Sequence, residues 1–384
     1  MLTRMSIDKI NQMAKKFPVL VITGPRQSGK TTTCKQAFSN YRYVTLENPD
    51  DRAFATKDPR SFLALYDNKV IIDEAQNVPE LFSYLQERVD TDNISGQYVL
   101  SGSQNFMLME KISQTLAGRV YIFELLPLCF SEIASTTKKG LLSFIQKGGY
   151  PRIYDKKISP VDFYPSYLKT YVERDVRSVL RVQELRLFKK FLLLCANQIG
   201  QLFNAHSISR DLGIDTKTVQ RWLSVLETGY IAFTLKPWHK NFSKRVIKTP
   251  KLYFYDTGLA ASLLGIDSED ELSASEFKGA LFENYVVLEL MKHNFAKGVN
   301  KNYYFWRDSN GNEIDLVVER GVNVSLVETK FSQTVKPEFL KGLHYLDPLK
   351  GSLKLKHYLV NSADKSQSRS YEKILSWRDA GSIE

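Results

Sequence analysis

The chain has 384 residues, of which 43% are hydrophobic and 25% charged, values that are ordinary for a folded globular protein and exclude a disordered or fibrous chain. Its net charge of +11 favours polyanionic partners, nucleic acid first and an acidic membrane surface second. No apolar run is long enough to span a bilayer and the first residues lack the apolar core of a signal peptide, so we expect a cytoplasmic protein without a membrane partner.

Cysteines and histidines show no metal-binding or disulfide pattern in the sequence. Cys34, Cys129 and Cys195 are far apart in apolar surroundings, which predicts buried, reduced thiols. The histidines have none of the spacings typical of a metal site, and we expect each of them to be structural or exposed to solvent: His206, His239, His293, His344 and His357.

The first part of the chain alternates short apolar runs with stretches of helical character. We expect the apolar runs to form buried strands at residues 17–23, 43–46, 70–73, 98–101 and 120–123. Because strands and helices alternate, the pattern predicts an α/β domain, residues 1–135, with a parallel sheet and helices on both of its faces.

The rest of the chain is expected to form three further parts. Residues 136–190 have the character of a helical connector, and residues 191–252 read as helices followed by strands in a winged-helix-like domain. In residues 253–384 a helix around Glu283 is followed by predicted strands, which indicates a second α/β domain. These strands are expected at residues 302–306, 314–319, 324–330 and 356–361.

A phosphate-binding loop is predicted between the first apolar run and the helix that follows it. Residues 24–31 fit the pattern G-x-x-x-x-G-K-[ST], in which glycines let the backbone turn tightly and several N–H groups point at an anion. Lys30 would reach the β and γ phosphates of ATP, and the Thr31 hydroxyl would bind Mg²⁺. Arg26 could face either the nucleotide or solvent. The predicted nucleotide-binding residues are Gly24, Pro25, Arg26, Gln27, Ser28, Gly29, Lys30, Thr31 and Thr32.

An acidic pair at the end of the third predicted strand supplies the second half of such a site. Asp73 follows three apolar residues and would hold the Mg²⁺ shell, while Glu74 could polarise the attacking water as a general base. An Asp-Glu pair alone is equally well explained as a solvated surface pair. Its position about 40 residues after the phosphate-binding loop favours the catalytic interpretation.

Two further candidates come from the last two strands of this domain. Ser103, close to the end of the strand at 98–101, would sense the γ-phosphate or orient water. Arg119 could contact a phosphate in the same chain or in a neighbouring subunit of a homo-oligomer. A surface arginine at a strand start explains it equally well.

A helix-turn-helix is predicted in the winged-helix-like part of the chain. The turn contains Gly213, and Asp215 can cap the second helix. Lys217, Thr218 and Arg221 would then project outward, as on a recognition helix. A basic stretch follows at residues 236–251, in which Lys244, Arg245 and Lys248 would neutralise phosphates from a β-wing. The alternatives are DNA contact and a packing module with a solvated basic loop.

Four residues near the C-terminus form a pattern that resembles the PD-(D/E)xK nucleases. Glu283 lies on a predicted helix, Asp315 at the start of a strand, and Glu328 and Lys330 on one face of the next strand. The carboxylates would bind Mg²⁺ or Mn²⁺ and Lys330 would position the nucleophile. A metal-free acidic cluster satisfied by Lys330 is the alternative, because a fold does not establish activity.

Several motifs together resemble a bacterial and archaeal family of AAA-type P-loop ATPases with a C-terminal PD-(D/E)xK nuclease-like domain. The likeness covers nearly the whole chain and rests on Gly24-Pro-Arg-Gln-Ser-Gly-Lys-Thr-Thr, Ile72-Asp-Glu-Ala-Gln, Leu100-Ser-Gly-Ser-Gln-Asn, Thr115-Leu-Ala-Gly-Arg, Leu125-Leu-Pro, Gly149-Tyr-Pro, Tyr171-Val-Glu-Arg-Asp and Lys251-Leu-Tyr-Phe-Tyr-Asp-Thr-Gly-Leu. The resemblance implies a P-loop ATPase fold, a winged-helix-like middle and a restriction-endonuclease-like C-terminal domain.

These observations predict an ATPase of the additional-catalytic-glutamate type that acts with DNA through the middle and C-terminal parts. A second hypothesis is an ATP-switched regulatory or interaction protein whose nuclease-like domain is inactive. A third is a ring-forming ATPase that remodels its substrate, for which homo-oligomerisation is required.

Overall fold

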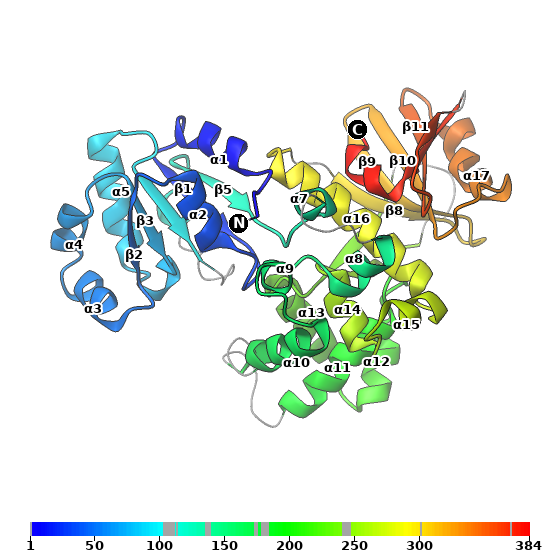
Figure 1. The fold of residues 1–384 in the computed structure, drawn as a ribbon, viewed down its shortest axis with the longest axis horizontal. Helices are drawn as coiled ribbons and strands as arrows, with labels where there is room; N and C mark the ends of the chain where they lie inside the picture. The colour runs from blue at the N-terminus through cyan, green and yellow to red at the C-terminus, as the bar shows by residue number, and fades with distance from the viewer. Residues whose placement is uncertain are drawn as a thin grey trace. The chain divides into compact units, whose positions relative to one another are not determined.

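The computed structural model describes residues 2–102, 112, 114–134, 140–172, 176–177, 184–239, 247–299, 302–368 and 371–384 (Figure 1). The chain divides into two compact units, the first formed by Met1–Leu128 with Phe295–Val299 and the second by Cys129–Asn294 with Asn300–Glu384. Among the described helices none combines the length and the apolar character needed to cross a bilayer.

The first unit contains a five-stranded parallel sheet, as the alternating pattern predicts. Its strands lie in the order β2-β3-β4-β1-β5, so β4 is inserted between β1 and β3. Parallel strands align their carboxyl ends at one edge of the sheet, and the residues that follow β1, β3 and β4 therefore lie side by side. The strands are β1 (Val19–Thr23), β2 (Arg42–Thr45), β3 (Val70–Asp73), β4 (Tyr98–Ser101) and β5 (Val120–Glu124).

Helices cover both faces of this sheet because its central strands are apolar on both sides. Val19 and Val21 of β1 pack with α3, α4 and α5, whereas Leu20 and Ile22 pack with α1 and α2. Side chains alternate between the two faces of a strand, so a continuous apolar run contributes to a hydrophobic core on each face of the sheet. The helices are α1 (Ile7–Ala14), α2 (Lys30–Ala37), α3 (Pro49–Lys57), α4 (Pro59–Leu65) and α5 (Leu81–Asp92), with a short 3-10 helix η1 (Ala75–Asn77) after β3.

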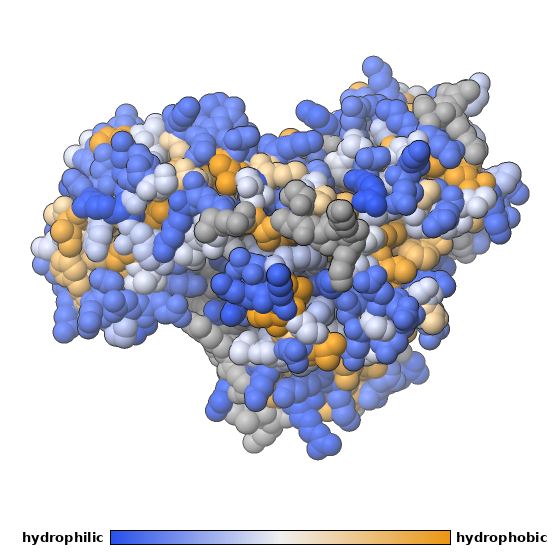
Figure 2. Space-filling view, in the orientation of Figure 1, coloured by the Kyte–Doolittle hydropathy of each residue, from blue (hydrophilic) through white to orange (hydrophobic). Residues whose placement is uncertain are grey.

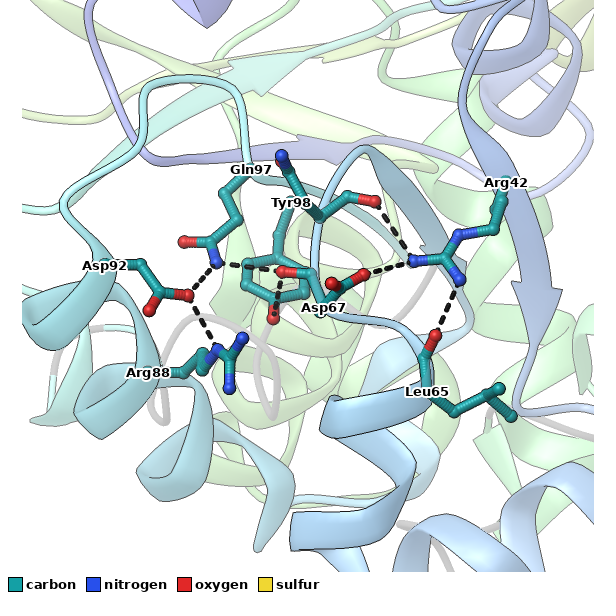
Figure 3. Close-up of polar contacts among 8 residues, drawn as sticks. Arg42, Leu65, Asp67, Arg88, Asp92, Gln97 and Tyr98 are labelled. Atoms are coloured by element: carbon teal, nitrogen blue, oxygen red, sulfur yellow. Dashed lines mark hydrogen bonds and ion pairs between the residues drawn. The ribbon is translucent and has the colours of Figure 1, made fainter.

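A polar network holds the amino edge of the sheet, opposite the phosphate-binding loop (Figure 3). The buried Gln97 donates from Nε2 to the Asp67 carbonyl at 2.9 Å and to Asp92 Oδ2 at 2.6 Å. Arg88 pairs with Asp92 at 2.6 Å, and Arg42 pairs with Asp67 at the same distance. The contacts join the segments that precede β3 and β4 to α5 and β2.

The second unit is built on an eight-stranded mixed sheet in the order β12-β13-β11-β10-β9-β8-β6-β7. The four strands predicted from residue 302 onward form here, close to their expected bounds. The strands are β6 (Ala232–Pro237), β7 (Lys251–Phe254), β8 (Asn302–Arg307), β9 (Glu313–Arg320), β10 (Asn323–Lys330), β11 (Lys354–Asn361), β12 (Gln367–Ser368) and β13 (Glu372–Ser376).

Most side chains of the long helix α16 are buried. The helices after β5 are α7 (Phe130–Ile133), α8 (Leu141–Lys147), α9 (Pro151–Asp155), α10 (Pro160–Tyr171), α11 (Leu185–Asn197), α12 (Ala205–Leu212), α13 (Thr216–Thr228), α14 (Thr257–Leu263), α15 (Glu269–Ala274), α16 (Lys278–Ala296) and α17 (Glu338–Lys341), with 3-10 helices η4 (Gly342–Leu349) and η5 (Trp377–Ser382).

Asp256 joins two of the motifs that are far apart in the sequence. Its buried carboxylate accepts hydrogen bonds from the Gly149 N–H at 2.7 Å, the Tyr164 hydroxyl at 2.6 Å and the Leu259 N–H at 2.9 Å. A Cβ at Gly148, whose φ is +67°, would lie 2.1 Å from Asp256 Oδ1. The break at residues 148–151 therefore has a packing role, which ties the segment we expected to be a connector to the start of α14.

The predicted helix-turn-helix is present as α12, a turn at Gly213 and α13. Gly213 has left-handed φ and ψ, and Asp215 caps α13 by accepting from the Thr218 N–H at 2.9 Å. The strand pair that follows is not a free wing. β6 pairs in parallel with β8 at Lys236 and Pro237, so the pair belongs to the large sheet. The predicted domain boundary at residue 252 falls inside β7.

Candidate nucleotide-binding site

The phosphate-binding loop connects β1 to α2, as its sequence predicts. Gly24 has φ +144° and a Cβ there would lie 2.3 Å from the Leu125 carbonyl oxygen, so no other residue fits at this turn. Gly29 caps α2 with φ 94° and ψ 20°. Backbone N–H groups at a helix N-terminus attract anions, and the loop therefore has the form of an anion site.

Lys30, the first residue of α2, folds back over this loop. Its Nζ donates to the Gly24 carbonyl at 2.9 Å and to the Pro25 carbonyl at 2.7 Å, and the residue is only 7% exposed. Burial lowers the pKa of Lys30 to about 8, against the opposing effect of the Glu74 and Asp73 charges. The negative charge of a bound phosphate would therefore stabilise the charged form of this buried amine.

The buried Asp73 collects hydroxyl groups from three neighbouring elements. Its Oδ2 accepts from the Thr31 hydroxyl at 2.8 Å and the Tyr43 hydroxyl at 2.9 Å, and its Oδ1 accepts from Ser101. Ser101 is the register partner of Asp73 on the adjacent strand β4. A carboxylate beside a threonine hydroxyl is an oxygen ligand set of the kind Mg²⁺ prefers, so the residues present fit that ion.

Glu74 directly follows β3 in an unusual backbone conformation. Its φ of 52° and ψ of 43° are left-handed, which is uncommon for a residue other than glycine and is found often at functional sites. Its Oε2 accepts a hydrogen bond from Gln76 Nε2. Gln76 is buried, and its Oε1 has no hydrogen-bond partner among the described residues. The Gln76 Oε1 atom is therefore an available hydrogen-bond acceptor beside the Glu74 carboxylate.

The structure adds Tyr43, Ser101 and Gln76 to the residues predicted from the sequence. Ser101 ends the strand expected at residues 98–101 and would have been found by taking the last strand residue rather than Ser103. Ser103 itself lies outside the described residues. Among the predicted loop residues, Ser28 is buried, Arg26 is half-buried and Thr32 is exposed.

Arg119 does not lie with these residues. It precedes β5, whose first residue pairs in register with Val19, the first residue of β1. β1 has five residues, about 16 Å, between this edge and the phosphate-binding loop. The guanidinium is paired instead with both carboxylate oxygens of Asp90. The prediction that Arg119 contacts a phosphate bound in its own chain is therefore wrong. The prediction that it contacts a phosphate in a neighbouring subunit stays a prediction.

Of the acidic residues predicted near the C-terminus, Glu283 pairs with Lys251, a lysine of the predicted basic stretch at residues 236–251. Lys251, 3% exposed, pairs with Glu283 at 2.8 Å and also with Glu313. The Tyr253 hydroxyl donates to the same Glu283 oxygen at 2.5 Å. Burial raises the pKa of Glu283 to about 7, although Lys251 acts in the opposite direction. Lys251 belongs to this cluster and not to an exposed basic wing.

Asp315, Glu328 and Lys330 lie on the adjoining strands β9 and β10. Asp315 Oδ2 accepts from both the N–H and the hydroxyl of Thr329 at 2.8 Å, and Lys330 donates to Glu328 Oε1 at 2.6 Å. Burial, and then the charge of Asp315, raise the pKa of Glu328 to about 8. Its other oxygen, Oε2, is buried without a hydrogen-bond partner in the described part of the chain.

The three predicted metal ligands of this cluster are not drawn together tightly. Among the described residues, three or more ligand atoms lie within 4.8 Å of one another at two other places, and Glu283, Asp315 and Glu328 are not such a group. In this arrangement Glu283 pairs with Lys251, Glu328 pairs with Lys330, and Asp315 accepts hydrogen bonds from Thr329. It agrees with the metal-free alternative as well as with a site that tightens around an ion.

The residues predicted to contact nucleic acid are partly engaged within the protein. Thr218 donates its hydroxyl to Asp215 at 2.7 Å, and Arg221 pairs with Glu184 at 3.0 Å. Lys217 and Lys248 are exposed. Lys244 and Arg245 lie outside the described residues.

Comparisons with known proteins identify the N-terminal part. A model of the AAA domain matches residues 16–134. Two models described as domains of unknown function, DUF8612 and DUF4143, match residues 138–270 and 278–379. The uncharacterized protein Rv2008c of Mycobacterium tuberculosis is 31% identical over 316 residues, which cover 81% of this chain and 70% of that protein. The chain belongs to the same family as Rv2008c.

This is an AAA-type ATPase family, and its AAA domain supports ATP binding and hydrolysis by the first unit. An uncharacterized protein of Haemophilus influenzae is 24% identical over 352 residues, 82% of each chain. Among solved structures, a Walker-type ATPase of Pyrococcus abyssi covers 67% of this chain and 94% of its own at 11% identity, with a TM-score of 0.45. The model that matches residues 278–379 is described as a domain of unknown function, so the nuclease-like fold stays a prediction.

The visible face of the molecule in Figure 2 is mainly hydrophilic, with apolar residues in small separate patches. Isolated apolar residues are normal on a protein surface and do not by themselves indicate an interface. The homo-oligomer that we considered stays a prediction.

Proposed function

We propose that the first unit binds Mg²⁺ with ATP at the phosphate-binding loop and hydrolyses the bond between the β and γ phosphates. The observation that carries this proposal is the contact of 2.8 Å between the Thr31 hydroxyl and the buried Asp73 carboxylate. It brings the end of β3 to the start of α2, next to the buried Lys30. The ion would supply charge neutralisation to the phosphates, with Thr31 and Asp73 holding it.

Each of the remaining residues has a role that its position supports. Lys30 binds the β and γ phosphates once its amine turns from the loop carbonyls. Glu74 accepts a proton from the attacking water, and Gln76 positions the Glu74 carboxylate. Ser101 and Tyr43 orient Asp73 by donating hydrogen bonds to it.

Steady-state ATP turnover of two variants tests this proposal. Lys30→Ala should lose nucleotide binding, and Asp73→Asn should lose the Mg²⁺ dependence and most of the turnover. Lys57→Ala, which removes an exposed lysine at the end of α3, is the matched control and should hydrolyse ATP like the wild type. Full turnover in Lys30→Ala would place the activity at another site.

A second candidate function is metal-dependent cleavage of phosphodiester bonds at Asp315 and Glu328. Two features favour a cation here: the unpartnered Glu328 Oε2, and the raised pKa of Glu328 in a cluster of buried carboxylates. A divalent ion would relieve the repulsion between these carboxylates and activate water.

The test is cleavage of single- and double-stranded DNA with Mg²⁺ or Mn²⁺, with and without ATP. Asp315→Asn should abolish cleavage while ATP turnover continues. Asp270→Asn, at an exposed position of α15, controls for the loss of one carboxylate. Equal cleavage by Asp315→Asn and the control would reject this site.

We also propose that ATP hydrolysis is coupled to DNA binding. The helix-turn-helix geometry of α12 and α13 supports this proposal. Replacing Lys244, Arg245 and Lys248 together by alanine should weaken DNA binding and flatten its salt dependence. Unchanged DNA binding, together with ATP-dependent capture of a protein partner, would favour the rival hypothesis of an ATP-switched regulator.

A further inference from the structure

We propose that His344, Asp347 and His357 bind a divalent transition-metal ion of the zinc class, held in place by Glu372. The sequence shows no metal-ligand spacing between these two histidines, but the fold brings their side chains together. The site lies on the second unit, and it does not depend on the ATPase function.

Three side chains converge on one point. His344 Nδ1 lies 2.7 Å from Asp347 Oδ2, and His357 Nε2 lies 2.8 Å from Asp347 Oδ1. The two imidazole rings are stacked, with centroids 4.8 Å apart. One ligand atom from each residue lies within 4.8 Å of the other two. An ion that binds nitrogen and oxygen at about 2.0–2.2 Å can therefore reach all three after small side-chain rotations.

The elements that carry these ligands are anchored in the core. His344 and Asp347 are three residues apart in the 3-10 helix η4, so they lie on the same side of that helix. Leu343 and Leu346 of the same 3-10 helix are fully buried against the sheet. His357 comes from β11, beneath η4. The ligand set thus joins η4 to the sheet.

Glu372 supplies the supporting contact that metal-bound histidines usually have. Its Oε1 lies 3.0 Å from His344 Nε2, the ring nitrogen that faces away from Asp347. Glu372 on β13 is the register partner of His357 on β11, which places both side chains on the same face of the sheet. A carboxylate on the distal nitrogen fixes the ring orientation and its tautomer.

The donor set selects the class of ion. Two imidazole nitrogens with one carboxylate suit zinc and similar first-row ions, whereas Mg²⁺ and Ca²⁺ prefer oxygen ligands alone. The side chains of His344 and Asp347 are 39% and 37% exposed, while that of His357 is 12% exposed. The ion is therefore held from the protein side and keeps a position open to water.

Zinc titration of the full chain, freed of metal by a chelator and followed with a competing chromogenic indicator, tests the proposal. Wild type should bind one more zinc ion per chain than the double variant His344→Ala/His357→Ala. His206→Ala, which removes an exposed histidine of α12, should bind zinc like the wild type.

A milder variant keeps the test valid if the double variant folds poorly. Glu372→Gln should retain the zinc stoichiometry and weaken its affinity about ten-fold or more, as loss of such supporting contacts does. Zinc should also raise the melting temperature of the wild type but not of the double variant. Equal zinc stoichiometry and affinity in wild type and both variants would overturn the proposal and leave an ion-pair network only.

Discussion

The buried amine of Lys30 predicts that ATP binding takes up a proton. Burial lowers the pKa of Lys30 to about 8. The charge of bound phosphates favours the ammonium form and raises this pKa. Binding is therefore strongest below about pH 7, where the amine is already charged, and weakens as the pH rises through about 8.

The magnitude follows from the titration of one group. The amine is uncharged in about a tenth of the molecules at pH 7, half at pH 8 and nine-tenths at pH 9. Proton uptake should rise through the same fractions, and the ATP affinity should fall about ten-fold from pH 7 to pH 9, or about 1.4 kcal/mol. Burial raises the pKa of Cys34 to about 12 and also raises the pKa of Tyr43, so neither of these two neighbours titrates in this window.

Isothermal titration calorimetry in buffers of different ionisation enthalpy measures this uptake directly. Lys30→Arg is the control, because a guanidinium remains charged throughout the window and should bind without proton uptake. Binding heats at pH 8 and pH 9 that are the same in every buffer, together with an ATP affinity that does not change with pH, would refute the account of Lys30 as the phosphate-binding amine.

Three further predictions concern residues of the fold. Gly24→Ala should prevent ATP binding, measured by calorimetry, because its Cβ would lie 2.3 Å from the Leu125 carbonyl oxygen. Asp256→Ala should lower the free energy of unfolding by about 3 kcal/mol in urea denaturation, because it leaves three buried donors unsatisfied; a loss under about 1 kcal/mol would contradict this. Arg119→Ala should keep the ATP turnover of dilute protein, since its exposed pair with Asp90 contributes little to stability, and a large loss would indicate a role in a neighbouring subunit.

Strand ends were the most predictable part of this protein. Apolar runs predict the positions of the five parallel strands, and the phosphate-binding motif with the acidic pair about 40 residues later predicts that the residues after β1 and β3 belong to one site. Lys30, Thr31 and Asp73 could therefore be placed together from sequence. Ser101 and Tyr43 could not, because which strands become neighbours of β3 depends on the sheet order and not on the local pattern.

The second unit departed further from its sequence pattern. Lys251 belongs to a basic stretch of the sequence, yet it is buried against Glu283. The reason is that β7 pairs with β6, which pairs with β8, so that β7 becomes part of the large sheet. His344 and His357 meet for the same reason: η4 packs over β11 and brings distant residues to one place. Sequence spacing reports contacts within one element, whereas these contacts come from packing between elements.

ATP hydrolysis at this site is tested most directly by Glu74→Gln, with ATP binding and turnover measured on the same preparation. The account predicts that the variant binds Mg²⁺ and ATP with nearly the wild-type affinity, while turnover falls about 100-fold or more through loss of the general base. Glu80→Gln, at an exposed position before α5, should behave like the wild type in both assays. Undiminished turnover in Glu74→Gln would contradict the assignment of this site as the catalytic centre.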